Sequence, residues 1–259
     1  RHGRPAGFPL RMGFTPEAPR YFTLAYKLSL RMGIAIVPVA DADVVFHWAD
    51  RTVCEEPPPD LEPRAVNRDV RDISKAHVSV LHQQVFGYDL EPDPGATELV
   101  EKSDENARHD GRVVTRPTGT PGLVVERLID NRLDDAIVRD HRVAVSNGQI
   151  GMCAARYRAV EDRFLSGHRN LYAALHAPDA YFTKAEQAAM VEMVRAIGAD
   201  WAELDVLRDR ASGRLYVVDV NPTPSGPVSA LGSADLAAYW RQQEASFAGL
   251  LQAHARLSG

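Results

Sequence analysis

The hydrophobic pattern of the first fifty residues predicts one helix followed by two strands. Residues 21–32 carry apolar side chains at helical spacing and stop at Gly33, a residue that suits a helix C-terminus. Two runs of β-branched and aromatic residues follow, at 34–39 and 44–48, and predict adjacent strands. This part of the chain is therefore expected to form a small α/β layer.

A segment rich in proline and acidic residues interrupts the pattern. Residues 55–63 contain four prolines and four acids, a composition typical of an extended linker. We place a domain boundary there, with a small α/β domain over residues 1–63 and a larger domain over residues 64–259.

Beyond the boundary the pattern predicts three helices and many strands. The first helix begins at Asp72 or Ser74 and ends near residue 86, the second covers 183–197 behind a Thr183 cap, and the third covers 233–257. Strands are predicted over residues 99–102, 112–116, 123–129, 138–146, 150–158, 202–208 and 214–220, with Ser146-Asn-Gly148 as a hairpin turn. The expected fold class is α+β.

The composition limits the classes of partner. The chain has 259 residues and a formal net charge of −5, which argues against nucleic acid or an anionic membrane as a partner. The longest apolar stretch is far shorter than the roughly 20 residues of a membrane helix. The two cysteines, Cys54 and Cys153, form no Cys-x-x-Cys pair, which fits a reducing compartment. We expect a cytoplasmic protein, with a homodimer as one option.

Common catalytic motifs are missing from the sequence. It contains neither a Gly-x-x-x-x-Gly-Lys-Ser/Thr loop nor a Gly-x-Gly-x-x-Gly turn after a strand, and its histidines lack the spacing of zinc ligands. Ser225 lies in Pro-Ser-Gly rather than in a nucleophile elbow, which disfavours a serine hydrolase.

The predicted C-terminal hairpin carries the clearest candidate chemistry. Asp219 and Asn221 are two residues apart on one strand and share a face, and Asp205 lies on the neighbouring strand. Carboxylate and amide oxygens without His or Cys suit Mg²⁺, which binds through one or two carboxylates plus substrate phosphates. The alternative is that Asp219 and Asn221 only begin a turn before Pro222. An Asp within an apolar run favours the metal site, because an unpaired buried carboxylate is costly.

With this hairpin as its last element, the sequence resembles the ATP-grasp superfamily, whose core ends on an acidic residue and a (Asp/Glu)-x-Asn-Pro pattern. Other family landmarks precede it in order. The resemblance implies that Lys75 and Lys102 contact phosphates, that residues 103–111 form the phosphate-covering loop, and that residues 124–130 form the adenine hinge. The hinge residues are Glu126, Arg127 and Leu128.

The following strands resemble those of glutathione-synthetase-like and RimK-like members. There, Arg142 and Arg156 correspond to arginines near the transferred phosphate. The resemblance implies two α+β lobes that clamp ATP, preceded by a small α/β domain. It also implies an ATP- and Mg²⁺-dependent ligase that joins a carboxylate to an amine through an acyl-phosphate, with Mg²⁺ on Asp205, Asp219 and Asn221.

Three other functions remain open from the sequence alone. A kinase for a small-molecule hydroxyl would share the ATP residues, a catalytically silent module would bind ATP without turnover, and a metal-dependent hydrolase would use Asp205 and Asp219 without a nucleotide. For Arg142 and Arg156 the alternative is a structural role on the sheet surface, in ion pairs with Asp140 and Glu161.

Overall fold

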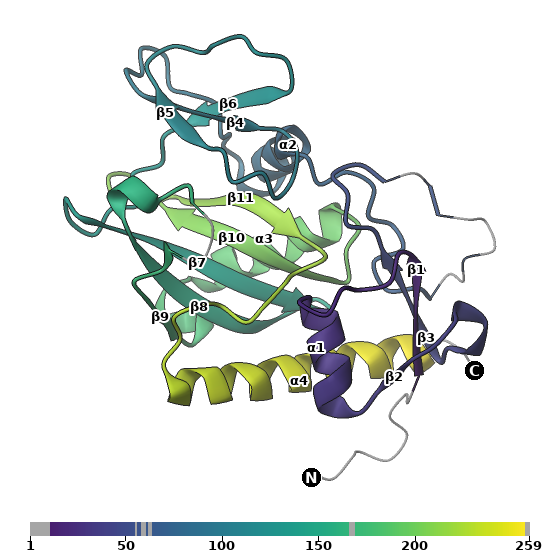
Figure 1. Cartoon of the computed structure of the whole chain (residues 1–259). Coiled ribbons are helices and arrows are strands. Elements are labelled where there is room, and N and C mark those ends of the chain that lie inside the picture. Colours follow the sequence, from purple (N-terminus) through teal and green to yellow (C-terminus); the bar gives the residue numbers. More distant parts are fainter. Residues whose placement is uncertain (1–10, 55, 58–60, 62–63, 166–168, 257–259) are drawn as a thin grey trace.

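The computed structural model describes residues 11–54, 56–57, 61, 64–165 and 169–256. Most of the predicted linker, namely residues 55, 58–60 and 62–63, lies outside the described residues, as does Leu257 at the end of the predicted last helix. The boundary between residues 63 and 64 stays a prediction. These described residues form three sheets and four α-helices (Figure 1).

The first sheet is parallel and has the strand order β2-β1-β3. Its strands are β1 (Arg11–Pro16), β2 (Ala35–Ile36) and β3 (Val44–Trp48), with α1 (Leu24–Met32) between the first two. The predicted adjacency of residues 34–39 and 44–48 is wrong, because β1 lies between them. The strand over 34–39 is also shorter than predicted: Pro38 has no N–H to donate, and Val39–Asp41 forms a 3₁₀ turn.

The second sheet is antiparallel and has the order β11-β10-β7-β8-β9. Its strands are β7 (Ile137–Ser146), β8 (Gln149–Ala159), β9 (Tyr172–Leu175), β10 (Trp201–Arg208) and β11 (Leu215–Asn221). The predicted turn between β7 and β8 is confirmed: Asn147 and Gly148 have φ values of 47° and 70°, as a type I′ hairpin requires.

The third sheet has the order β5-β4-β6 and stands over the second sheet (Figure 1). Its strands are β4 (Leu99–Ser103), β5 (Arg112–Val114) and β6 (Leu123–Arg127). All three were predicted, each with slightly different ends. The third sheet and the second therefore face each other as two α+β lobes.

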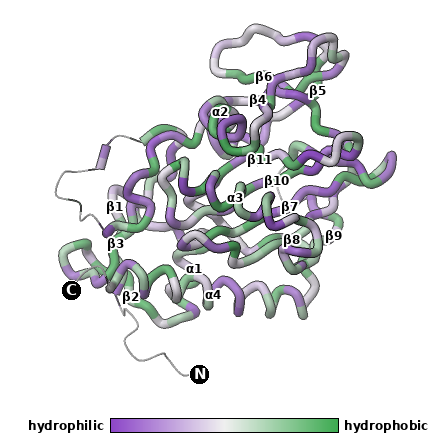
Figure 2. Tube along the Cα trace, turned by 180° about the vertical axis from the view of Figure 1, so that it is seen from behind, coloured by the Kyte–Doolittle hydropathy of each residue, from purple (hydrophilic) through white to green (hydrophobic). Residues whose placement is uncertain are grey.

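Helices cover the five-stranded sheet on two sides. Helices α2 (Lys75–Phe86) and α3 (Lys184–Ala196) pack on one face and bury a core with β7, β10 and β11. Helices α1 and α4 (Ser233–Arg256) share a second core with β1, β3 and the other face. The tube of α4 alternates between hydrophilic and hydrophobic colours, as expected for a helix with one buried side (Figure 2). No helix of the described part of the chain has the length and apolar character to cross a membrane.

The helix ends agree with the sequence patterns that predicted them. Ser74 caps α2 by accepting a hydrogen bond from the His77 N–H, and Thr183 and Glu186 form the predicted capping box of α3. The predicted fold class, α+β, is confirmed.

Candidate functional site

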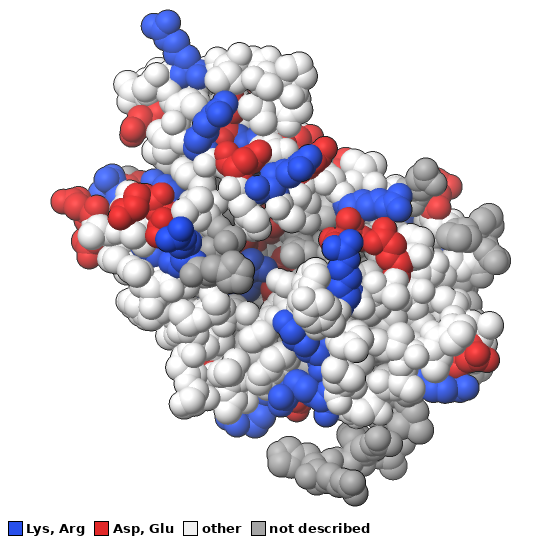
Figure 3. Space-filling view, in the orientation of Figure 1, with Lys and Arg blue, Asp and Glu red and all other residues white. Residues whose placement is uncertain are grey.

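A cavity of about 620 Å³ lies between the three-stranded and the five-stranded sheets. Charged side chains of both signs surround a hollow beneath the three-stranded sheet (Figure 3). We call the wall contributed by β7, β8, β10 and β11 the floor, and the three-stranded sheet with residues 103–111 the roof. All ten candidate residues from the sequence line this cavity: Lys75, Lys102, Glu126, Arg127, Leu128, Arg142, Arg156, Asp205, Asp219 and Asn221.

The floor brings the three candidate metal ligands together through strand register. Asp205 on β10 lies directly opposite Asp219 on β11, and Glu203 lies opposite Asn221. Residues two apart on a strand share a face, and opposite pairs have Cβ atoms about 5 Å apart, so these four side chains form one polar patch. The ladder shifts register just after Asp205, which ends this regular arrangement.

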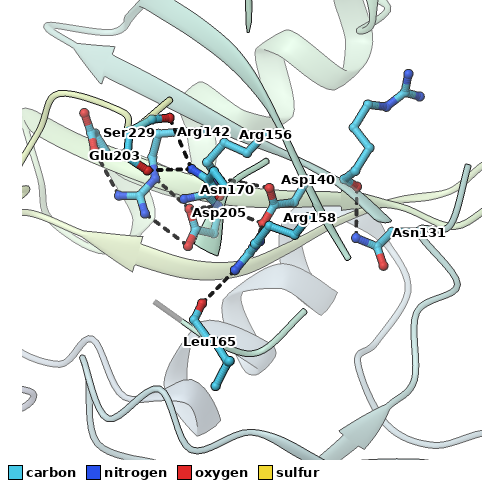
Figure 4. Close-up of polar contacts among 11 residues, drawn as sticks. Asn131, Asp140, Arg142, Arg156, Arg158, Leu165, Asn170, Glu203, Asp205 and Ser229 are labelled. Atoms are coloured by element: carbon cyan, nitrogen blue, oxygen red, sulfur yellow. Dashed lines mark hydrogen bonds and ion pairs between the residues drawn. The ribbon is translucent and has the colours of Figure 1, made fainter. Parts of the chain in front are cut away.

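Two arginines neutralise Asp205 (Figure 4). Arg156 Nη2 donates to Asp205 Oδ1 at 2.9 Å, and Arg142 Nη2 donates to Oδ2 at 3.3 Å. Arg142 Nε lies 2.7 Å from Oδ1, in a geometry too poor for a hydrogen bond. Burial opposes ionisation of Asp205, but the guanidiniums of Arg142 and Arg156 outweigh it and lower its pKa to about 2.

The same arginines connect Asp205 to two buried acids. Arg156 makes a two-pronged contact with Asp140, at 3.0 and 2.9 Å, and Arg142 Nη1 donates to Glu203 Oε2 at 2.9 Å. Burial raises the pKa of Glu203, and the nearby Arg142 opposes this shift. The structure thus gives Arg156 the expected partner Asp140, but the pair is buried rather than on the sheet surface, and Asp205 takes the place expected for Glu161.

The roof supplies a separate ion pair. Lys102 on β4 and Glu126 on β6 are 2.7 Å apart, and their side chains are 14% and 7% exposed. Glu126 Oε1 is buried and accepts no hydrogen bond from any residue that the structure describes. The Arg127 side chain is held by Asp93 at 2.7 Å and by the Tyr216 hydroxyl at 3.0 Å. Of the hinge residues, Glu126 therefore has unused hydrogen-bonding capacity in the cavity.

Lys75 links α2 to the floor. As the first residue of α2 it donates from Nζ to Asp219 Oδ1 at 2.7 Å. Asp104, in the predicted phosphate loop, accepts from the Ala76 N–H at 2.9 Å and so fixes the loop to the same helix end. Within this loop Ala107 and His109 adopt left-handed φ values of 59° and 52°. The loop therefore uses backbone conformations that favour glycine, although its only glycine is Gly111.

The donor set of the floor suits a hard cation only in part. Among the described residues no group of three His, Cys, Asp or Glu side chains could hold a metal ion. Asp205, Asp219 and Asn221 offer oxygen donors alone, and Asn221 Oδ1 also accepts from the Thr223 N–H at 2.9 Å, the turn contact expected as the alternative. These residues fit Mg²⁺ that takes its remaining ligands from water and phosphate.

Residues that the sequence reasoning missed complete the site. Arg158 on β8 donates to Asp140 and lies in the cavity, and Asn170 donates from Nδ2 to Ser229 Oγ at 2.9 Å. The spacing of two residues from Arg156 to Arg158, and from Glu203 to Asp205, could have identified Arg158 and Glu203, because such residues share a strand face. No sequence signal identifies Asn170 or Ser229, which lie outside strands.

The cavity is electrically balanced, although the chain is acidic. Eight acids and eight bases among the described residues line it. The acids are Asp50, Glu105, Asp110, Glu126, Asp140, Glu203, Asp205 and Asp219, and the bases are Lys75, Lys102, Arg108, Arg127, Arg142, Arg156, Arg158 and Arg163. Many strong donors and acceptors are thus available without a net field that would exclude either sign.

No protein-family model and no curated protein matches the chain. Among solved structures, the chain is similar to D-alanine–D-alanine ligase from Bacillus anthracis complexed with ATP, with a TM-score of 0.57 and 13% identity over 96% of this chain and 100% of that one. It is also similar to the macrocyclase MdnC from Microcystis aeruginosa bound with the precursor peptide MdnA, with a TM-score of 0.51 and 11% identity over 91% and 98% of the chains. The chain has the ATP-grasp fold that the order of its motifs predicted.

Proposed function

We propose that this protein is an ATP- and Mg²⁺-dependent ligase that forms an amide bond from a carboxylate and an amine through an acyl-phosphate. One observation carries the proposal: a single cavity between two lobes collects all ten residues that the motifs assign to nucleotide, metal and phosphoryl transfer. The D-alanine–D-alanine ligase of similar fold is complexed with ATP, which supports nucleotide use here.

The nucleotide would lie between roof and floor. Residues 126–128 would receive the base at the hinge, where Glu126 Oε1 is an acceptor that no described residue uses. Lys102 and Lys75 would contact phosphates, each exchanging its present carboxylate partner for a phosphate oxygen. Such an exchange needs little rearrangement, because both ammonium groups already lie at the cavity wall.

Asp205, Asp219 and Asn221 would hold the Mg²⁺, whose charge offsets that of the phosphates when it is bound. Since Lys75 and the two arginines now neutralise the two carboxylates, the cation would compete with them. Two carboxylates and one amide are a weak site without phosphate oxygens. We therefore expect Mg²⁺ to bind with the nucleotide rather than alone.

The two arginines would act on the transferred group. A carboxylate oxygen attacks the γ-phosphorus and ADP leaves; the amine then attacks the acyl carbon, phosphate leaves, and the amine proton passes to solvent. Arg142 and Arg156 would hold the γ-phosphate and then the acyl-phosphate with paired N–H groups. Their attachment to Glu203 and Asp140 fixes both guanidiniums before substrate arrives.

The direct test is a screen of ATP consumption against pooled carboxylates and amines, with the product identified by mass. An amide plus phosphate supports the ligase. A phosphorylated alcohol would identify a kinase instead, and binding without turnover for any pool would identify a silent module.

The metal assignment is tested separately with Asp219→Asn, which keeps a hydrogen-bond acceptor for Lys75 and removes the charge. We expect MgATP affinity to fall on the order of a hundredfold, because one of two carboxylate ligands is lost. Affinity for ATP in EDTA should change little. The control is Asp179→Asn, an exposed acid that pairs with Lys184 outside the cavity. A thermal shift with Mg²⁺ alone but none with ATP would favour the metal-dependent hydrolase, and would contradict the ligase and the expectation that Mg²⁺ binds only with the nucleotide.

A further inference from the structure

Arg163 is the one base of the cavity that forms no ion pair with a described residue. Each of the other bases that line the cavity has a carboxylate partner. Asp130 attracts Arg163 from beyond ion-pair distance, but Asp130 is itself paired with Arg132 and Arg210. The positive charge of Arg163 therefore has no neighbouring carboxylate that neutralises it.

The Arg163 guanidinium keeps hydrogen-bond donors that a ligand can reach. Its Nη2 donates to the Ile129 carbonyl at 3.0 Å and to Asn131 Oδ1 at 2.7 Å. Its Nε and Nη1 donate to no residue in the described part of the chain, and neither atom is completely buried. Burial lowers the pKa of Arg163, and the surrounding charges do not reverse this shift. An anion beside Nε or Nη1 would compensate the charge that burial disfavours.

Arg163 lies where the hinge and the predicted phosphate loop approach each other. Ile129 and Asn131, which hold its Nη2, come directly after the hinge residues. The next side chain, Phe164, packs against Gly111 at the end of the phosphate loop, where a Cβ atom on residue 111 would lie only 2.8 Å from Phe164 Cδ1. In the proposed function the hinge receives the base and the loop covers the phosphates. Arg163 thus lies beside the junction of nucleoside and phosphate chain.

We propose that Arg163 binds the α-phosphate of the nucleotide with the free donors of its guanidinium. Hydrogen bonds between an ionised donor and an ionised acceptor are about twice as strong as neutral ones. The proposal rests on the proposed use of ATP and adds a cation to the phosphate contacts expected of Lys75 and Lys102. Those two lysines must leave a carboxylate partner to meet a phosphate, whereas Arg163 has no such partner to leave.

The test compares the affinities of adenosine, AMP, ADP and ATP, measured by calorimetry in EDTA, between the parent protein and Arg163→Gln. Glutamine removes the charge but retains an N–H donor for Ile129 or Asn131. We expect the dissociation constants of AMP, ADP and ATP each to rise roughly ten- to hundredfold, because each nucleotide has an α-phosphate. The dissociation constant of adenosine should change less than about twofold. The difference between the two proteins should shrink as KCl is added, because salt screens the lost attraction.

Three further variants complete the test. Arg163→Lys keeps the charge, so its nucleotide affinities should lie between those of the parent and of Arg163→Gln. Arg163→Met also removes the charge, and it replaces Arg163→Gln if that variant does not fold. Arg195→Gln is the control for the change in net charge, because Arg195 is exposed, pairs with Glu192 on α3 and does not line the cavity. It should bind all four ligands like the parent.

The outcomes separate this proposal from the proposed ligase. If adenosine loses as much affinity as ATP, Arg163 only shapes the base pocket through Ile129 and Asn131, and the phosphate contact is overturned. Unchanged affinities for AMP, ADP and ATP in Arg163→Gln overturn it as well, while the use of ATP stands. A parent protein that binds none of these nucleotides, with or without Mg²⁺, overturns both the ligase and the role of Arg163.

Discussion

The floor and the roof of the cavity hold charge in different ways. The floor carries a connected network in which Asp140, Arg156 and Arg158 are each less than 10% exposed. The described part of the roof lines the cavity with two separate ion pairs, Lys102–Glu126 and the exposed Arg108–Glu105, and it contributes no strand residue to the two large apolar cores. In a connected buried network each side chain is held by several partners, which fixes one arrangement of the side chains. The two side chains of an isolated ion pair can exchange partners at a low cost in free energy.

This difference suits different roles for the two walls in the proposed reaction. In the proposed function, the groups that must be placed accurately for phosphoryl transfer lie on the floor, where burial and mutual pairing fix them. The roof groups proposed to release and recapture the nucleotide in each cycle lie on a sheet that is held by fewer contacts. Damage to the floor should therefore lower stability and activity together, and damage to the roof should lower nucleotide affinity alone.

The largest effect is expected from Asp140→Ala on the floor. The change leaves Arg156 and Arg158 buried without their shared carboxylate, and such loss of one partner typically costs about 3–5 kcal/mol. Urea denaturation should show this loss in the free energy of unfolding. As a control, Asp130→Ala breaks half-exposed pairs with Arg132 and Arg210 and should cost about 1 kcal/mol or less. Equal midpoints for the two variants would show that the floor network is not specially coupled.

Arg156→Lys tests whether the floor needs only the positive charge of Arg156 or also the geometry of its guanidinium. Lysine keeps the charge but cannot reproduce the two-pronged contact with Asp140 together with the bond to Asp205. We expect ligation to fall on the order of a hundredfold, which corresponds to roughly 3 kcal/mol of transition-state stabilisation. Stability should also fall, by about 1–3 kcal/mol, because a buried carboxylate loses a donor. Turnover at the parent rate with the true substrate would make Arg156 purely structural.

Behind the floor, where α2 packs on β11, a buried histidine should make the free energy of unfolding depend on pH. His82 is fully buried, and burial lowers its pKa to about 4, aided by Arg127. The unfolded imidazole titrates near 6.5, so between pH 6.5 and 4 the unfolded chain binds a proton that the folded chain refuses, and stability is lost as the pH falls.

Between pH 7 and pH 5 this one residue should cost about 2 kcal/mol of unfolding free energy. His82→Gln, whose amide oxygen can still accept from the Val217 N–H, should show a smaller loss over the same range in urea denaturation. His141, with a pKa lowered to about 2 mainly by burial, gives a loss of the same sign in both proteins and cancels in the difference. An unchanged pH dependence would mean that folding does not lower the pKa of His82.

The sequence predicted the helices and strands that build the floor and the roof. It did not predict the network of ion pairs within the floor. Helix α3 and the β7–β8 hairpin carry strong local signals, namely the capping box at Thr183 and the Asn147-Gly148 turn, and both are confirmed. Strand β1 has no such signal. It contains a glycine and ends in proline, and it is a strand because the distant β2 and β3 pair with it.

The ion pairs of the floor depend on register, which local patterns do not encode. Arg142 meets Asp205, and Asp140 meets Arg156, because these residues are cross-strand partners on neighbouring ladders. A register shift of one residue would send the side chains to opposite faces. The motifs could therefore nominate Arg142 and Asp205 individually, while their mutual neutralisation became visible only in the assembled sheet.

The smallest effect is expected on the roof, from Lys102→Gln. Glutamine can still donate a hydrogen bond to Glu126, so the buried carboxylate keeps a partner while the positive charge is lost. We expect the dissociation constant of MgATP to rise about tenfold, equivalent to about 1.4 kcal/mol, because one charged phosphate contact becomes neutral. The free energy of unfolding should change by no more than about 1 kcal/mol, and calorimetry with urea denaturation measures both quantities. If Lys102→Gln destabilises the protein as strongly as Asp140→Ala, the Lys102–Glu126 pair contributes as much to stability as the floor network. That result would contradict the different roles proposed for the two walls.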